Sequence, residues 1–180
     1  MKKEWLIILS GPIIILITVG VILTINLYKD FEESGFSTWS HTWIPLESLR
    51  DNDAVHLSYG MKWNGVGSPI IKEITIIKSD GTVLNESDRL SAIPYIYVSG
   101  SYGSLAENEE RTIDTVYQEI QDYQPDKESF VLTYILSMEE FDQSYKTTEI
   151  KQLKIKYKLF GIERVQFIDF DGFFREIDYW

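Results

Sequence analysis

Residues 53–63, which read DAVHLSYGMKW, decide the fold class, because apolar side chains return at every second position. The apolar set is Val55, Leu57, Tyr59, Met61 and Trp63, and it alternates with Ala54, His56, Ser58, Gly60 and Lys62. A period of two over this length is typical of a β-strand with one buried and one solvated face. We therefore predict a sheet-forming domain in which His56 lies on the solvated face.

Several segments further along the chain repeat this pattern. The predicted strands are residues 70–78, 92–98, 129–138, 150–160 and 164–169. Turn residues predict a hairpin through Ser79-Asp80-Gly81 into 82–84 and another through Asp171-Gly172 into 173–179. Pro94 places its strand at a sheet edge or a bulge. In the segment 150–160, Lys154, Lys156 and Lys158 predict a basic stripe on a solvated face.

One helix is predicted among these strands. Ile113, Val116, Tyr117 and Ile120 fall at helical spacing, so a helix is expected after Ser104 and before Pro125. Seven to nine short strands with little helix predict a mainly β fold, an antiparallel β-sandwich of immunoglobulin-like architecture with one short helix. An α+β fold is the alternative. The chain has no cysteine, so a packed core and not disulfide bonds must stabilise it.

The N-terminal segment has a different character. Residues 6–25 read LIILSGPIIILITVGVILTI, and no charged residue lies between Glu4 and Lys29. As a helix these residues span about 30 Å, the thickness of the hydrocarbon core of a bilayer. Trp5 and Tyr28 lie at its two edges, where aromatic rings settle among lipid headgroups. Because the run is longer than that of a signal peptide and the first alanine is Ala54, we predict an uncleaved transmembrane helix at residues 5–28.

The flanking charges predict the orientation. Lys2 and Lys3 precede the apolar run, while Asp30, Glu32 and Glu33 follow it. The basic end is expected to stay inside the cell. This divides the chain into a cytoplasmic tail at 1–4, the membrane helix at 5–28, a stalk and first strand at 29–52, and an extracytoplasmic sandwich at 53–180. Within the stalk, Trp39 and Trp43 are expected to be buried at the edge of the core, with the headgroup layer as the alternative.

Charge excludes one class of partner. Residues 30–180 contain 14 lysines and arginines against 27 aspartates and glutamates. A domain with this balance is repelled by phosphate backbones, so we expect no binding to nucleic acid.

The sequence nominates no catalytic or metal site. Phosphate-binding loops, the nucleophile elbow of hydrolases and the HExxH zinc motif are all absent, which favours a binding protein over an enzyme. The only histidines are His41 and His56, and both are interpreted as surface residues. We expect no cofactor. Calcium is the one alternative, through loops such as Asp51-Asn52-Asp53, residues 107–110 or Asp169-Phe170-Asp171.

Aromatic residues provide the candidate interaction surface. Tyr95, Tyr97 and Tyr102 gather around a loop rich in glycine and serine, and Trp180 lies in an aromatic C-terminal segment with Phe170, Phe173 and Phe174. Rigid rings beside small residues suit contacts with proteins or sugars, whereas core and edge packing is the favoured alternative.

These observations favour a single-pass module of the cell envelope that binds another envelope protein or a wall polymer. The second hypothesis is an accessory or sensor subunit that acts through its membrane helix, for which Gly20 and Thr24 supply a weak small-residue spacing. An envelope hydrolase is the third and least favoured.

Overall fold

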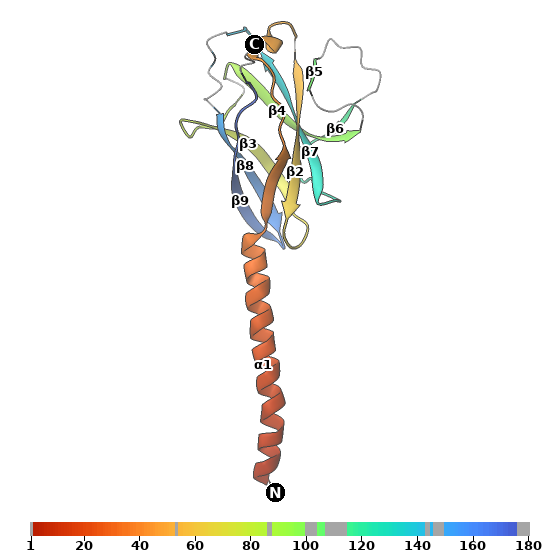
Figure 1. Cartoon of the computed structure of the whole chain (residues 1–180), viewed down its shortest axis with the longest axis vertical. Helices are drawn as coiled ribbons and strands as arrows, with labels where there is room; N and C mark the ends of the chain where they lie inside the picture. The colour runs from red at the N-terminus through yellow and green to blue at the C-terminus, as the bar shows by residue number, and fades with distance from the viewer. Residues whose placement is uncertain are drawn as a thin grey trace, which may run out of the picture.

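The computed structural model describes residues 2–52, 54–85, 88–99, 104–106, 115–142, 145 and 150–175, with side chains from residue 14 onward except in 104–106. A long helix projects from one end of a β domain (Figure 1). The helix is α1 (Lys2–Glu33). The strands are β1 (Gly35–Ser40), β2 (Val55–Asn64), β3 (Ile70–Lys78), β4 (Leu90–Ser99), β5 (Ser104–Ala106), β6 (Val116–Gln118), β7 (Ser129–Met138), β8 (Ile150–Leu159) and β9 (Ile162–Asp169).

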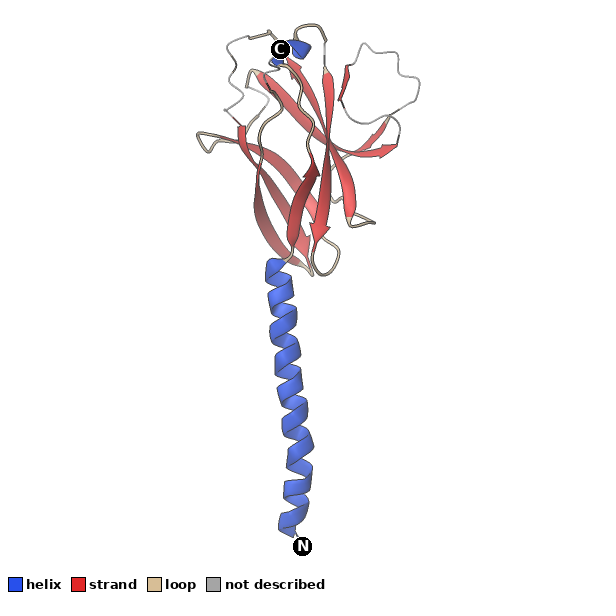
Figure 2. Ribbon diagram, in the orientation of Figure 1, coloured by secondary structure: helices blue, strands red, loops and turns tan. Residues whose placement is uncertain are grey.

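The strands form two antiparallel sheets (Figure 2). One has the order β1-β2-β7-β4-β6, with β5 also paired to β2, and the other has the order β3-β8-β9. The expected hairpin after β3 is present, since Gly81 has a φ of 85° and Ile77 pairs with Val83. The described part of the chain therefore confirms a mainly β, two-sheet sandwich.

The core lies between the two sheets as one cluster. Leu57, Tyr59, Met61, Leu132, Tyr134 and Leu136 come from the larger sheet, and Leu153, Ile155, Tyr157 and Leu159 come from the smaller one. The ring of Phe36 on β1 lies 5.2 Å from that of Tyr157 on β8, which joins the sheets directly. The alternation predicted for β8 is confirmed, with Lys154, Lys156 and Lys158 half-buried on the outer face.

The solvated face predicted for β2 is wrong over most of its length, because His56 and Ser58 are also buried. β2 is an interior strand, paired with β7 on one side and with β1 and β5 on the other. Other side chains cover the outer face of the sheet at these positions. The Trp39 ring lies over Gly60, and the Tyr117 hydroxyl is hydrogen-bonded to His56. Position in the sheet thus overrides the alternation of side chains.

The helix predicted between Ser104 and Pro125 is wrong in its described parts. Its first residues form β5 and Val116–Gln118 form β6, while residues 107–114 lie outside the described residues. Tyr117 pairs with Tyr97 on β4, so sheet pairing determines the local conformation. Outside α1, the described residues contain one short helix, a 3-10 turn at Leu46–Leu49.

The hairpin predicted at Asp171-Gly172 is also absent from the described residues. After β9 the chain crosses to the 41–45 segment, where Phe174 forms a parallel bridge with Ile44 and the Ile44 N–H donates to the Phe173 carbonyl at 3.1 Å. Phe170, Phe173 and Phe174 are buried, which confirms core packing for these rings. These rings fill the end of the sandwich, where they pack against Tyr59 and Tyr134.

Residues 29–52 contain the end of α1, β1 and the 3-10 turn, so the sandwich begins directly after Ser34. The burial expected for two tryptophans in this interval is wrong. Trp39 is 60% exposed and Trp43 is 38% exposed. Trp39 is five residues past Ser34 along β1, which runs away from the helix (Figure 1).

Candidate functional site

The outer face of the six-stranded sheet carries the tyrosines that the sequence singled out. Tyr95 and Tyr97 follow Ile93 at period two on β4, so the three side chains share one face. Ladder pairing adds Ile135 of β7 opposite Ile93 and Tyr117 of β6 opposite Tyr97. We call this surface the tyrosine face; it consists of His56, Ile93, Tyr95, Tyr97, Tyr117 and Ile135.

A compact polar and aromatic group lies at the centre of this face. The Tyr95 and Tyr117 rings are 6.0 Å apart, and the Tyr117 hydroxyl lies 2.7 Å from Nδ1 of His56. Beneath them, the hydroxyls of Ser58 and Thr133 are hydrogen-bonded at 2.9 Å. These four polar side chains under the tyrosine face are therefore paired with one another, which holds the Tyr117 ring in place.

The surroundings of these rings are apolar. Ile93 is 48% exposed, and at the end where β4 meets β6, Val98 and Val116 are 53% and 48% exposed. None of the six residues of the tyrosine face carries a carboxylate, lysine or arginine. Half-buried tyrosines with apolar neighbours are typical of surfaces that bind another macromolecule.

Only half of the predicted surface can be placed. Tyr95 and Tyr97 lie together, whereas Tyr102 and Trp180 lie outside the described residues. The sequence does not identify Tyr117 or His56 as residues of the tyrosine face. Its periodicity predicts a helix around Tyr117 and a solvated position for His56. Their contact joins residues 61 positions apart, and a single sequence has no local signal for such pairing.

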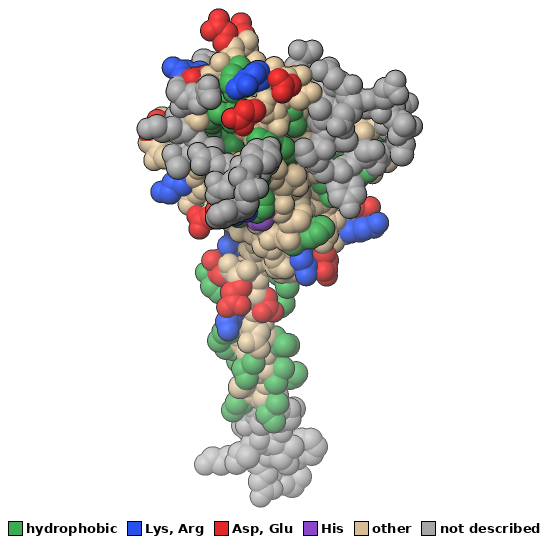
Figure 3. Space-filling view, turned by 45° about the horizontal axis from the view of Figure 1, so that its top comes forward, with side chains coloured by type: hydrophobic (Ala, Val, Ile, Leu, Met, Phe, Trp, Pro, Cys, Tyr) green, Lys and Arg blue, Asp and Glu red, His purple; other side chains and the backbone are tan. Residues whose placement is uncertain are grey.

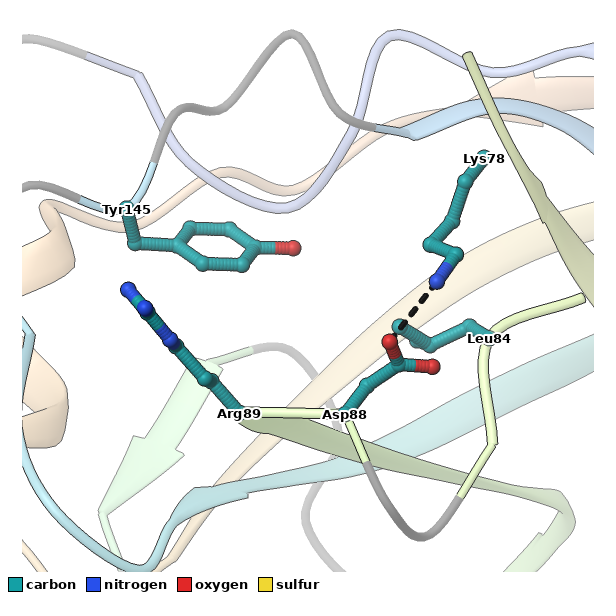
Figure 4. A pocket seen from close by; sticks show the side chains of 5 residues that line it. All are labelled: Lys78, Leu84, Asp88, Arg89 and Tyr145. Atoms are coloured by element: carbon teal, nitrogen blue, oxygen red, sulfur yellow. Dashed lines mark hydrogen bonds and ion pairs between the residues drawn. The ribbon is translucent and has the colours of Figure 1, made fainter. Parts of the chain in front are cut away.

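A pocket of about 230 Å³ opens at the far end of β3. Figure 4 shows its lining residues, which are Lys78, Leu84, Asp88, Arg89 and Tyr145. Lys78 Nζ donates to Asp88 at 2.7 Å, and Arg89 forms an ion pair with Asp142. Burial opposes ionisation of Asp88, but hydrogen bonds from Lys78 and the Asn85 N–H outweigh it and lower the pKa of this carboxyl. These charges neutralise one another, so the pocket fits a structural role better than proton transfer.

Metal binding finds no support in the described part of the chain, where no three His, Asp or Glu side chains gather closely enough to hold an ion. Asp169 instead accepts a hydrogen bond from Gln152 at 3.1 Å. Asp53 and residues 107–110 lie outside the described residues. The ring of His41, one of the two histidines of the chain, stacks on the Trp43 ring with centroids 5.7 Å apart, so its contact is aromatic.

The joint between α1 and the sandwich is the second feature of interest. Arg164 of β9 donates to the carbonyls of Phe31 and Glu32 in the last turn of the helix, and its guanidinium lies 4.6 Å from the centre of the Phe31 ring. A helix leaves its last carbonyls without partners and carries partial negative charge at that end. Arg164 supplies hydrogen-bond donors for these carbonyls and a positive charge for the negative end of the helix. A strand of the sandwich therefore caps the helix.

Ser34 completes this joint. Its hydroxyl donates to the Asp30 carbonyl at 2.6 Å and accepts from the Val66 N–H at 3.0 Å. Gly65 fits tightly beside it, since a Cβ there would lie 2.1 Å from the Ser34 hydroxyl oxygen. Helix and sandwich are therefore connected by side chains as well as by the backbone.

Beyond the joint, the described side chains of α1 are exposed and do not belong to the core of the sandwich. Its residues 14–28 are exposed, and the segment Ile14–Glu33 is long and apolar enough to cross a membrane. In Figure 3 hydrophobic side chains cover much of its coloured surface away from the domain, and charged ones gather where it meets the domain.

The chain matches no protein-family model, no curated protein and no solved structure, so its function must be argued from the site alone.

Proposed function

We propose that this protein is a single-pass, membrane-anchored module of the cell envelope, which displays its sandwich outside the cytoplasm to bind another envelope protein. The observation that carries the proposal is that every residue of the apolar helix from Ile14 to Tyr28 is exposed. Burying such a surface from water is worth about 25 cal/mol per Å², and the sandwich offers it no partner in the described structure. A bilayer supplies that partner.

The tyrosine face is the proposed contact surface for the partner. It is rigid, apolar at its rim and free of its own charge, while the rest of the domain is strongly acidic. Tyrosine side chains provide large contact area at low conformational cost, and depletion of charge marks the centre of protein interfaces. A protein therefore fits this surface better than a wall polymer does.

Site-specific photo-crosslinking in the native cell tests the proposal. A photoreactive phenylalanine analogue at Ile93 or Tyr97 is expected to give a discrete protein adduct. The control is the same analogue at Val165, which is 53% exposed on the opposite sheet. Adducts that form equally well at Val165, or at none of these positions, contradict an interaction through the tyrosine face.

The joint favours a second candidate, an accessory or sensor subunit that acts through its helix. Because Arg164 and Ser34 fasten the sandwich to α1, a rotation of the sandwich turns the helix with it. Flexible linkers transmit no such motion.

Insertion of four glycines between Glu33 and Ser34 separates the two candidates. A binding module keeps its function when its tether becomes flexible, whereas a sensor loses it. A matched replacement of residues 6–25 by an unrelated apolar helix tests lateral pairing of the span. Retained function in both variants dismisses the sensor.

A further inference from the structure

The turn between β8 and β9 holds a bulky ring where the backbone favours small or polar residues. Phe160 and Gly161 form this two-residue turn, with φ values of 50° and 85°. Two positive φ values are the signature of a type I′ turn, for which Asn-Gly and Gly-Gly are preferred. A phenylalanine in this conformation is strained, because its Cβ crowds the neighbouring backbone. Turn formation therefore does not explain Phe160.

Burial in the core does not explain it either. The Phe160 side chain is 67% exposed, and the next apolar residue along the chain, Ile162, is 56% exposed. The ring is nevertheless held in place. It lies 6.1 Å from the ring of Phe31 on α1, and a Cβ on Gly67 would lie 2.5 Å from its tip. Figure 1 shows the β8–β9 turn reaching down beside the top of the helix.

The height of Phe160 relative to a bilayer follows from the helix. Tyr28 ends the apolar run, at the level where tyrosine rings settle among headgroups. Phe31 is three residues further, about 4.5 Å along the axis. The headgroup layer is roughly 5–8 Å thick on each side of the hydrocarbon. Counted from Ile25, the last residue of the apolar run of about 30 Å, Phe31 lies about 9 Å outward. Phe31, and Phe160 beside it, therefore lie at the outer boundary of that layer.

We propose that Phe160, with Ile162 at the edge of the contact, inserts into the headgroup layer of the outer leaflet and fixes the stance of the sandwich on the membrane. This inference rests on the proposed membrane span. The surface that contacts Phe160 is proposed to be lipid for two reasons. The turn lies next to the proposed membrane-crossing helix, and Phe160 and Ile162 are apolar and exposed. The acidity of the domain favours zwitterionic over anionic lipids.

Spin labelling of the full chain in phosphatidylcholine vesicles tests this contact. The chain has no cysteine, so single substitutions place one label each. Phe160→Cys reports the turn, Leu16→Cys reports the middle of the span, and Val165→Cys reports an exposed site on the same sheet. Power saturation compares the access of oxygen, which concentrates in lipid, with that of a water-soluble nickel chelate. Circular dichroism of each labelled protein checks the fold.

The expected ratio of oxygen to nickel access at position 160 is several-fold above that at 165 and below that at 16. Equal ratios at 160 and 165 overturn the lipid contact while the span stands. A label at 160 that is immobile and reached by neither reagent indicates a protein neighbour, such as a second copy, and also overturns it. Water access at position 16 refutes the span itself, and the lipid contact with it.

Discussion

The hydroxyl of Tyr134 is buried between the sheets and has no hydrogen-bond partner among the described residues. The neighbouring Tyr59 differs, because its hydroxyl donates to the Thr42 carbonyl at 3.0 Å. An unpaired buried polar group is destabilising by about 1–3 kcal/mol, whereas a made hydrogen bond contributes about 1 kcal/mol. These two similar side chains should therefore respond in opposite directions to the same substitution.

We expect Tyr134→Phe to raise the free energy of unfolding by about 1 kcal/mol and Tyr59→Phe to lower it by a similar amount. Thermal melting of the full chain in detergent, followed by near-ultraviolet circular dichroism, measures both. Each variant is the matched control for the other. A lower midpoint for Tyr134→Phe than for Tyr59→Phe would show that the Tyr134 hydroxyl has a partner.

The same two tyrosines predict a loss of stability in alkali. Burial raises the pKa of Tyr134, and burial together with the nearby Tyr134 raises that of Tyr59, both well above the ordinary value of 10.0. Above pH 10 the unfolded chain releases these protons while the folded chain keeps them. Stability is therefore complete below that pH and falls above it, by about 1.4 kcal/mol per pH unit for each tyrosine.

Unfolding by urea at a series of pH values measures this slope. Tyr134→Phe should reduce the decline by about 1.4 kcal/mol per unit. A slope that is identical in the variant and the parent contradicts the burial of an ionisable hydroxyl at this position.

Between the elements, single side chains replace missing strand pairing. Gln166 of β9 behaves like a strand backbone toward β1: its Oε1 accepts from the Phe36 N–H at 2.7 Å, and its Nε2 donates to the Phe36 carbonyl at 2.8 Å. This pair of bonds links the edge of the small sheet to the edge of the large one. The Phe36 amide should therefore depend on a residue 130 positions away.

We expect Gln166→Ala to accelerate amide hydrogen exchange at Phe36 and to lower the free energy of unfolding by about 1–3 kcal/mol. Gln166→Glu keeps the acceptor and loses the donor, so its effect on this amide should be smaller. Mass spectrometry of peptides that cover β1 measures the exchange. Equal exchange in all three proteins would contradict the bridge.

Arg164, two residues before Gln166 on the same strand, predicts a mechanical effect. Two spin labels, at Tyr28→Cys and Val165→Cys, report the distance between helix and sandwich. We expect a narrow distribution in the parent and a clearly broader one in Arg164→Ala, because the helix carbonyls lose their cap. Arg164→Lys should be intermediate, since lysine keeps the charge but not the two-pronged geometry. A distribution unchanged by alanine argues against a joint built on Arg164.

At the scale of single elements, the sequence predicts best the strands that have a long apolar or alternating pattern. β7 and β8 were expected near their observed bounds because apolar side chains return at alternate positions over ten residues, and β3 because it is rich in isoleucine. β9 begins two residues before the strand predicted at 164–169. β6 was missed because three residues carry no period of their own, and Tyr117 is placed by pairing with Tyr97. The buried state of His56 was missed for the same reason, since its cover comes from a distant strand.

At the scale of the whole molecule, composition predicts an apolar helix followed by a cysteine-free sandwich, and the structure agrees. The close fastening of helix to sandwich was not foreseen, because it depends on Arg164 and Val66, which are far from Ser34 in the chain. Two of the six residues of the tyrosine face, Tyr95 and Tyr97, were singled out from tyrosine clustering alone. The other four follow only from the register of β2, β4, β6 and β7.

The central claim is that α1 crosses a membrane and leaves the sandwich outside the cytoplasm. Labelling of single cysteines on intact cells with a membrane-impermeant maleimide tests it most directly, since the chain has no cysteine of its own. Val165→Cys should be labelled on intact cells, and Lys2→Cys only after the cells are opened. Labelling of Lys2→Cys on intact cells, or protection of Val165→Cys until lysis, would contradict the account.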